Sequence, residues 1–159
     1  MDLILVSYEP ADPPVTVSAA HVARILGGER TLGRRVRSLD DLRRLVEAGL
    51  PVAALAKVVA HVAEAGAAAG QLRYRIVPKA TLHRRRSVLT LEESERLERL
   101  ARVTALAEDV WEDEALAHEF LREAQPQLGG ERPLDLVRTE LGARQIEDLL
   151  MKLEYALPA

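Results

Sequence analysis

The sequence predicts an all-α protein, because its composition favours helices over strands. Aromatic residues make up 3% of the 159 positions, whereas Ala, Leu, Glu and Arg are abundant. Strands prefer aromatic and β-branched side chains, and the abundant residues here are good helix formers. Hydrophobic residues make up 48% of the chain, which is enough to bury a core and argues against disorder along the whole length. We therefore expect one moderate helical domain or two small ones.

Serine, proline and glycine positions set the helices expected in the first half. Three prolines before residue 15 rule out a continuous helix there, so residues 1–17 are expected to form a flexible arm. Ser18 and Ser38 suit N-caps, and Pro51 suits a first helical turn. The small-residue run 66–70 is expected to interrupt the helical structure. The helices predicted from these signals cover 18–26, 39–48 and 51–65.

N-caps followed by apolar stripes mark the helices of the second half. Thr90 and Glu93 form a capping box, and the helix that it begins is expected to reach Trp111. Asp113 suits the cap of a helix to about Ala124. The predicted core side chains of this half are Leu97, Leu100, Val103, Thr104, Ala107, Val110, Trp111, Leu116, Phe120, Leu121, Leu134, Leu136, Ile146, Leu149, Leu150 and Leu153.

Prolines and glycines delimit the last elements. After a loop over 125–130, Pro133 is expected to open a short helix that Gly142 ends. Pro158 is expected to terminate the final helix.

Charge is unevenly distributed, although the net charge is only −3. Residues 1–70 hold 8 basic and 8 acidic side chains, 71–90 hold 6 basic and no acidic ones, and 91–159 hold 8 basic and 17 acidic ones. The basic segment suits a phosphate backbone, and the acidic half suits a protein partner. The basic segment equally suits packing against an acidic neighbour in the same molecule, so charge alone leaves both interpretations open.

The residues needed for catalysis or metal binding are missing or scattered. With no Cys in the chain, disulfides, thiolate zinc sites and cysteine nucleophiles are excluded. The chain has four histidines, which are His21, His61, His83 and His118. They lie far apart without paired ligand spacing, and no glycine-rich nucleotide motif is present. We therefore expect no enzymatic activity, no cofactor and no metal site.

The sequence also lacks signals for a membrane. No apolar run reaches the roughly 20 residues of a membrane helix. The N-terminal segment is too short for a signal peptide and lacks a basic leader. A cytoplasmic protein is expected.

The segment around Pro78 is predicted to form a helix-turn-helix. Pro78 disfavours a helical conformation at Val77, so one helix ends near Ile76 and another spans 78–86. The second helix of such a motif presents basic and hydrogen-bonding side chains to the major groove. The predicted DNA-binding residues are Arg73, Arg75, Lys79, Thr81, His83, Arg84, Arg85 and Arg86. The alternative is a solvated basic helix end without a DNA role.

Several motifs resemble the Xre/MbcA/ParS type of bacterial toxin–antitoxin antitoxins. The motifs that carry the resemblance are VPKATLHRRR (77–86), LEESERL (91–97), LARV (100–103), LGGERPLDLVRT (128–139) and GA (142–143). Those that resemble the subgroup paired with RES-domain toxins are LGG (26–28), TLGRRV (31–36) and GLP (49–51). The resemblance covers roughly residues 22–157, and it departs from the family at Ile76, where a small turn residue is common, and at the insert 67–70.

The resemblance implies a two-part helical antitoxin of a type II system. An N-terminal domain over 18–89 is expected to dimerise and to bind operator DNA through its helix-turn-helix, repressing its own operon. A C-terminal domain over 90–159 is expected to bind a co-encoded RES-type toxin, which degrades NAD in that family, and to obstruct its active site. The predicted toxin-binding residues are Leu128, Gly129, Gly130, Arg132, Tyr155, Leu157, Pro158 and Ala159.

Two other functions stay open on the sequence. One is a helix-turn-helix transcription regulator without a toxin partner, whose acidic half serves only for dimerisation. The other is a protein-interaction adaptor with a vestigial DNA motif. The apolar tail 155–159 either packs on the chain's own core or is offered to a partner.

Overall fold

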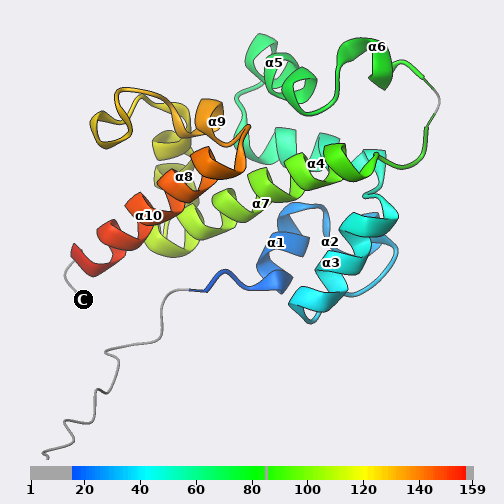
Figure 1. The fold of residues 1–159 in the computed structure, drawn as a ribbon, viewed down its shortest axis with the longest axis horizontal. Helices are drawn as coiled ribbons and strands as arrows, with labels where there is room; N and C mark the ends of the chain where they lie inside the picture. Colours follow the sequence, from blue (N-terminus) through cyan, green and yellow to red (C-terminus); the bar gives the residue numbers. More distant parts are fainter. Residues whose placement is uncertain (1–15, 85, 157–159) are drawn as a thin grey trace, which may run out of the picture.

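The computed structural model describes residues 16–84 and 86–156, which form helices joined by short loops (Figure 1). No strand occurs in these two ranges, where extended pairing is limited to isolated bridges between Pro51 and Val88 and between Gln125 and Glu131. The predicted all-α class is confirmed. Within the same ranges, no helix combines the length and hydropathy of a segment that crosses a bilayer.

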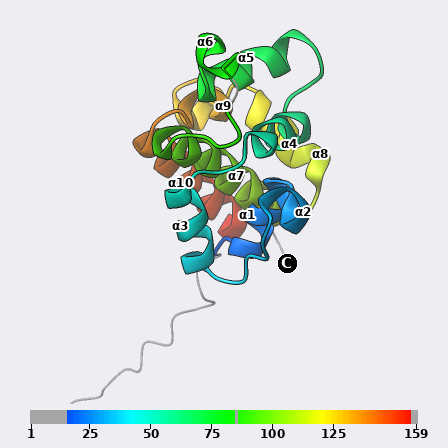
Figure 2. The same ribbon diagram turned by 90° about the vertical axis from the view of Figure 1, so that its right-hand side faces the viewer.

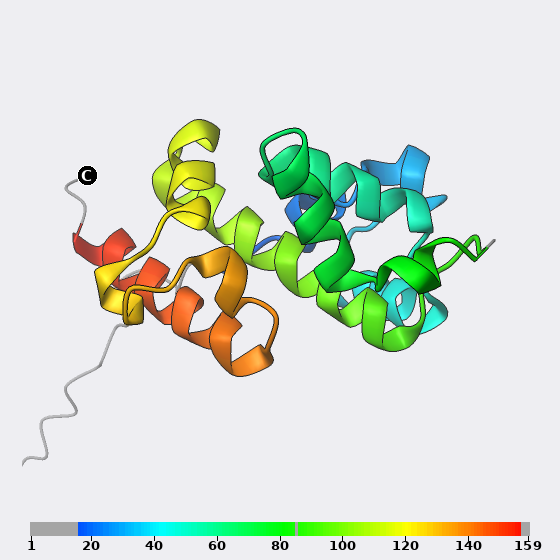
Figure 3. The same ribbon diagram turned by 90° about the horizontal axis from the view of Figure 1, so that it is seen from above.

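The longest helix, α7 (Leu91–Trp111), forms the centre of the molecule (Figure 3). Its predicted capping box is present, since the Thr90 hydroxyl accepts the Glu93 backbone N–H at 3.2 Å and the Glu93 carboxylate accepts the Thr90 N–H at 2.9 Å. Helices from both halves of the chain pack on α7. A single helix therefore supports both the N-terminal and the C-terminal parts.

Six helices precede α7, in the part of the chain that the structure describes. They are α1 (Ala19–Ile25), α2 (Gly28–Leu32), α3 (Leu39–Ala48), α4 (Val52–Val62), α5 (Ala67–Ile76) and α6 (Lys79–Leu82). Figure 2 shows α5 and α6 at one end of the molecule, with α1, α2 and α3 at the other. As predicted, Ser38 caps α3, where its hydroxyl accepts the Asp41 N–H at 3.1 Å.

Three helices and one short 3-10 turn follow α7 in the described residues. They are α8 (Glu114–Arg122), the 3-10 turn η1 (Pro126–Leu128), α9 (Pro133–Leu136) and α10 (Glu140–Ala156). Asp113 caps α8 as predicted, accepting the Leu116 N–H at 2.9 Å. The end of the final helix that was assigned to Pro158 lies outside the described residues.

Several predicted boundaries are wrong. The run 66–70 does not form a non-helical segment as a whole. Gly66 caps α5 with a φ of +91°, and residues 67–70 form the first turn of this helix. The helix after Pro51 ends at Val62 rather than near Ala65. The short helix α2 was not predicted at all.

Gly142 does not end a helix but lies inside α10. A Cβ atom at this position would overlap the backbone carbonyl of Leu136 in α9. The close approach of two helices therefore explains the glycine. In the sequence, a glycine at such a contact cannot be distinguished from one that ends a helix.

The core is one continuous cluster that includes side chains from both halves. The predicted stripe of α7 is buried from Leu97 to Val110, while Trp111 is half-buried against the cluster. Phe120 belongs to the core, and its ring centroid lies 6.0 Å from that of Trp111. Leu116 was also predicted in the core, but it is 47% exposed.

Candidate DNA-binding and toxin-binding sites

α5, the turn at Val77 and Pro78, and α6 form the helix-turn-helix expected from the sequence. Val77 is extended, with φ −127° and ψ 117°, as a residue before proline must be. Ile76 and Val77 are buried, and Nη1 of Arg96 in α7 donates to the Ile76 carbonyl at 2.8 Å. This bond satisfies a carbonyl at the C-terminal end of α5. The turn is thus fastened to the central helix by apolar packing and one guanidinium.

The second helix of the motif is shorter than predicted. α6 is one turn with His83 as its C-cap, whereas the sequence predicted a helix over 78–86. The chain leaves the helix because the following segment pairs elsewhere: the Leu89 N–H donates to the Leu50 carbonyl at 2.8 Å. The Ser87 carbonyl accepts from the Val52 N–H at 3.0 Å.

Part of the predicted DNA-binding set is exposed. Lys79, His83 and Arg84 lie at the surface, while Arg73 and Thr81 are half-buried. The Lys79 ammonium lies 5.8 Å from the centre of the Tyr74 ring, within the range of a cation–π contact. Arg84 forms no ion pair with any described residue. Arg85 lies outside the described residues.

Two members of the predicted set bind carboxylates of the same molecule. Nη2 of Arg86 donates to both oxygens of Glu93, at 3.0 and 3.2 Å. Burial raises the pKa of the Glu93 carboxyl, but hydrogen bonds from the Thr90 backbone and Arg86 outweigh burial and hold the pKa below its ordinary value. Arg75 of α5 pairs with Asp135 of α9. For Arg75 and Arg86, the interpretation of packing against an acidic neighbour is therefore correct.

Asp135 joins the predicted DNA-binding and toxin-binding sets. Its Oδ1 accepts from Arg75 and, at 3.1 Å, from Arg132, whose Nε also donates to Oδ2 at 2.7 Å. Burial raises the pKa of Asp135, but the two guanidinium groups outweigh burial and lower it. Sequence reasoning assigned Arg75 and Arg132 to separate partners and missed the carboxylate that connects them.

The LGG motif forms a compact loop between α8 and α9. Leu128 is buried in the core, and Gly129 and Gly130 adopt φ values of +69° and +80°, which side chains rarely adopt. Within the loop, the Gly130 N–H donates to the Gln125 carbonyl at 3.0 Å. Leu128 therefore anchors the loop, and the two exposed glycines form its tip.

The remaining predicted toxin-binding residues lie at or beyond the end of α10. Tyr155 is 63% exposed. Leu157, Pro158 and Ala159 lie outside the described residues.

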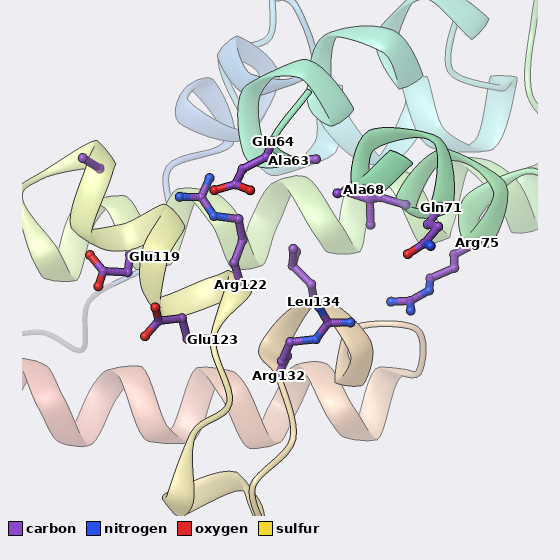
Figure 4. A pocket seen from close by; sticks show the side chains of 12 residues that line it. Ala63, Glu64, Ala68, Gln71, Arg75, Glu119, Arg122, Glu123, Arg132 and Leu134 are labelled. Carbon is purple, nitrogen blue, oxygen red and sulfur yellow. The ribbon is translucent and has the colours of Figure 1, made fainter. Parts of the chain in front are cut away.

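A cavity of about 590 Å³ lies between α4–α5 and α8–α9 (Figure 4). Figure 4 shows Glu64 and Arg122 close together, Leu134 and Arg132 below them, and Arg75 at the right of the view. The cavity carries both signs of charge and is lined by both halves of the chain.

Three histidines that lie far apart in the sequence meet at one carboxylate. His61 of α4 and His118 of α8 lie with Nε2 at 2.5 and 2.9 Å from Glu108 Oε1. Nε2 of His21, in α1, lies 2.9 Å from Oε2 of the same Glu108. No local spacing could predict this cluster, because each histidine comes from a different helix.

The cluster strongly favours the ionised form of the Glu108 carboxyl over its protonated form. Burial raises the pKa of Glu108, but hydrogen bonds from the three histidines outweigh burial and lower the pKa from 4.5 to about 2. The hydrogen bond to Glu108 raises the pKa of His61 above 6.5, against the opposing effect of burial.

A helix-turn-helix with exposed basic side chains is the architecture of a DNA-binding domain, and one long helix joins it here to a second helical part. Two family models match these parts. The Antitoxin Xre-like helix-turn-helix domain matches residues 41–102, and the Antitoxin Xre/MbcA/ParS C-terminal toxin-binding domain matches residues 106–156. The chain therefore belongs to the Xre/MbcA/ParS antitoxin family. Both are binding domains, which confirms the prediction of a non-enzymatic protein.

The chain is also similar to a curated relative, Antitoxin Xre of Pseudomonas putida (strain KT2440). The two are 33% identical over 84 residues, which are 51% of this chain and 53% of that protein. The chain thus spans about half the length of the relative it matches. The two family models meet inside α7, between residues 102 and 106, whereas the domain division at 89 and 90 stays a prediction.

Proposed function

We propose that this protein neutralises a co-encoded RES-type toxin that degrades NAD, by obstructing the toxin's active site, and represses its own operon by binding operator DNA as a dimer. The observation that carries the proposal is the pairing, across α7, of a toxin-binding domain with a helix-turn-helix domain. Because operator binding takes place on the chromosome, the proposal also places the protein in the cytoplasm.

The RES identity of the toxin rests on the N-terminal motifs over 26–28, 31–36 and 49–51. Their glycines take special conformations: φ is +109° at Gly27, +73° at Gly33 and +95° at Gly49. These positions shape the ends of α2 and the turn between α3 and α4. The resemblance of these motifs to the RES-paired subgroup is what supports the RES identity, and their glycines have a local structural role.

For the toxin contact, we propose a surface that includes the exposed Gly129–Gly130 tip, Arg132 and Tyr155. Tyrosine at an exposed helix end is a suitable anchor, because it buries a large ring at low entropic cost. Leu141, which is 74% exposed near the start of α10, extends the apolar part of this domain's surface.

Co-expression tests neutralisation. Cells that express the RES-type product of the adjacent gene are expected to lose NAD and stop growing, and co-expression of this protein is expected to restore both. The matched variant is Tyr155→Ala, which should weaken the rescue while leaving the helical circular dichroism spectrum unchanged. Failure of the unaltered protein to restore NAD and growth would contradict neutralisation.

Operator binding and dimerisation are tested on the purified protein. Light scattering is expected to give twice the chain mass of 17.6 kDa, and the upstream DNA of its own gene is expected to be bound in a salt-dependent manner. Binding and repression that need no neighbouring toxin gene would instead support a plain transcription regulator. Absence of any DNA binding would leave the adaptor function.

A further inference from the structure

We propose that His61, His118 and Glu108 form a binding site for a borderline divalent metal ion, best suited to Zn²⁺. Imidazole nitrogens and a carboxylate are a ligand set that zinc prefers, and a site with three protein ligands completes its tetrahedron with water. This site goes beyond the binding of toxin or DNA. It would fasten helices of the helix-turn-helix part to the toxin-binding domain.

The first support is the convergence of ligand atoms. One ligand atom from each of His61, Glu108 and His118 lies within 4.8 Å of the other two. The Nε2 atoms of His61, His118 and His21 lie 2.5 to 2.9 Å from the oxygens of Glu108. Zinc–nitrogen bonds of about 2.0–2.1 Å in a tetrahedron place ligand atoms about 3.3 Å apart. Side-chain rotations that bring ligand atoms from within 4.8 Å to this spacing would admit the ion.

The second support is the arrangement of carboxylates behind the histidines. A metal-binding histidine nearly always donates its other ring N–H to a carboxylate, carbonyl or water. Nδ1 of His21 lies 2.9 Å from Asp109 Oδ1, and Nδ1 of His61 faces Glu114 Oε1 at 3.8 Å. Asp109 thus lies within hydrogen-bond distance of His21, which in turn lies against the second oxygen of Glu108.

Burial favours the bound ion. His21 and His118 have 10% and 8% of their side chains exposed, and Glu108 has 12%. His61 is the most accessible ligand, at 27%, and provides a path of entry. The rings of His61 and His118 meet edge to face with centroids 4.8 Å apart, so both can direct Nε2 at one point.

The three ligands come from α4, α7 and α8. The family models cover His61 with the helix-turn-helix domain and Glu108 and His118 with the toxin-binding domain. The ion would therefore bridge the two domains on the side of α7 that His21 covers. Its removal should loosen the contact between them.

Zinc titration of the full-length protein tests the site. After treatment with a chelator and its removal, calorimetric titration with ZnCl₂ is expected to show one ion per chain, micromolar or tighter affinity, and proton release on binding, since zinc replaces protons at the ligands. Tm should rise with zinc and fall again with chelator. Cobalt(II) should give the visible absorption of a tetrahedral site. Absence of binding at 100-fold molar excess of zinc would overturn the proposal.

Variants separate this site from surface binding. Glu108→Gln and His118→Gln should each lower zinc affinity at least tenfold, and Asp109→Asn, which loosens the hold of His21 on Glu108, should lower it by a smaller factor. His83→Gln is the matched control and should bind zinc normally, because His83 is far from the cluster in sequence and exposed at the C-cap of α6. If the cluster variants, checked for folding by circular dichroism, bind zinc as well as the control, the ion lies elsewhere and the site is refuted. If one does not fold, the cobalt spectrum of the unaltered protein and Asp109→Asn decide.

Discussion

At the scale of single residues, contacts between residues close in the sequence were predictable. Contacts between residues far apart in the sequence were not. Ser38, Thr90 and Asp113 were identified as N-caps because a cap bonds to backbone only three residues away. Glu108 had no such signal, since its partners His21 and His61 lie 87 and 47 residues away. The same holds for Asp135, whose partner Arg75 is 60 residues distant.

Exposure decides which basic residues should contact DNA. Arg84→Ala is expected to weaken binding on all sequences and to lower the slope of log affinity against log salt by about 0.9, because it removes one phosphate contact. Arg75→Ala is the control, since the Arg75 guanidinium already pairs with Asp135, and it should change the slope less. Electrophoretic mobility shifts over a range of salt concentrations measure both. An unchanged slope in Arg84→Ala would exclude that contact.

The Glu108 cluster predicts a pH window for stability in the presence of chelator. The folded state lowers the pKa of Glu108 from 4.5 to about 2, so its contribution is complete above pH 4.5 and is lost as pH falls toward 2. The pKa of His61 is raised from 6.5, so its contribution is complete below pH 6.5 and is lost as pH rises through the folded pKa. Stabilisation should be greatest between these limits.

Glu108→Gln tests this window. The difference in unfolding free energy between the parent and the variant, from urea denaturation, should be largest near pH 5–6 and shrink on both sides. A difference that does not vary with pH would show that the carboxylate acts only by packing.

At the scale of elements, the helices themselves were predictable, but their ends depended on tertiary contacts. The period of apolar residues located α7 and α8 correctly. Glycine was misleading at 66–70 and at Gly142. Gly66 lies at the start of α5, whereas Gly142 lies where α10 comes close to α9. α6 was overestimated because sequence propensity does not report the pairing of 87–89 with 50–52.

A pair of glycine substitutions tests this interpretation. Gly142→Ala should destabilise the protein by about 1–3 kcal/mol, because the added Cβ meets the Leu136 carbonyl and overpacking has this cost. Gly70→Ala, in a helix with no atom within 4 Å of its Cβ, should instead stabilise by up to about 1 kcal/mol through helix propensity. Urea midpoints measure both. Equal effects of the two substitutions would show that the α9 contact is unimportant.

At the scale of the whole molecule, the two binding parts are physically connected. The net charges of the segments suggested separate partners, yet Arg75 and Arg86 are paired with acidic residues of the later chain. Composition could predict the basic and acidic segments, but not which charges cancel inside the fold. The exposed part of the basic set is consequently smaller than the sequence indicated.

This connection predicts that the toxin-binding domain limits DNA affinity. Asp135→Asn should release Arg75 and Arg132, so DNA is expected to bind more tightly and the salt slope to steepen by about 0.9 as Arg75 reaches a phosphate. The stability should change by less than about 1 kcal/mol, because Arg75 is 44% exposed and its pair is partly screened. The double variant Arg75→Ala with Asp135→Asn should lose the gain. If Asp135→Asn binds DNA as the parent does, or if the gain persists without Arg75, then the ion pair does not couple the two domains.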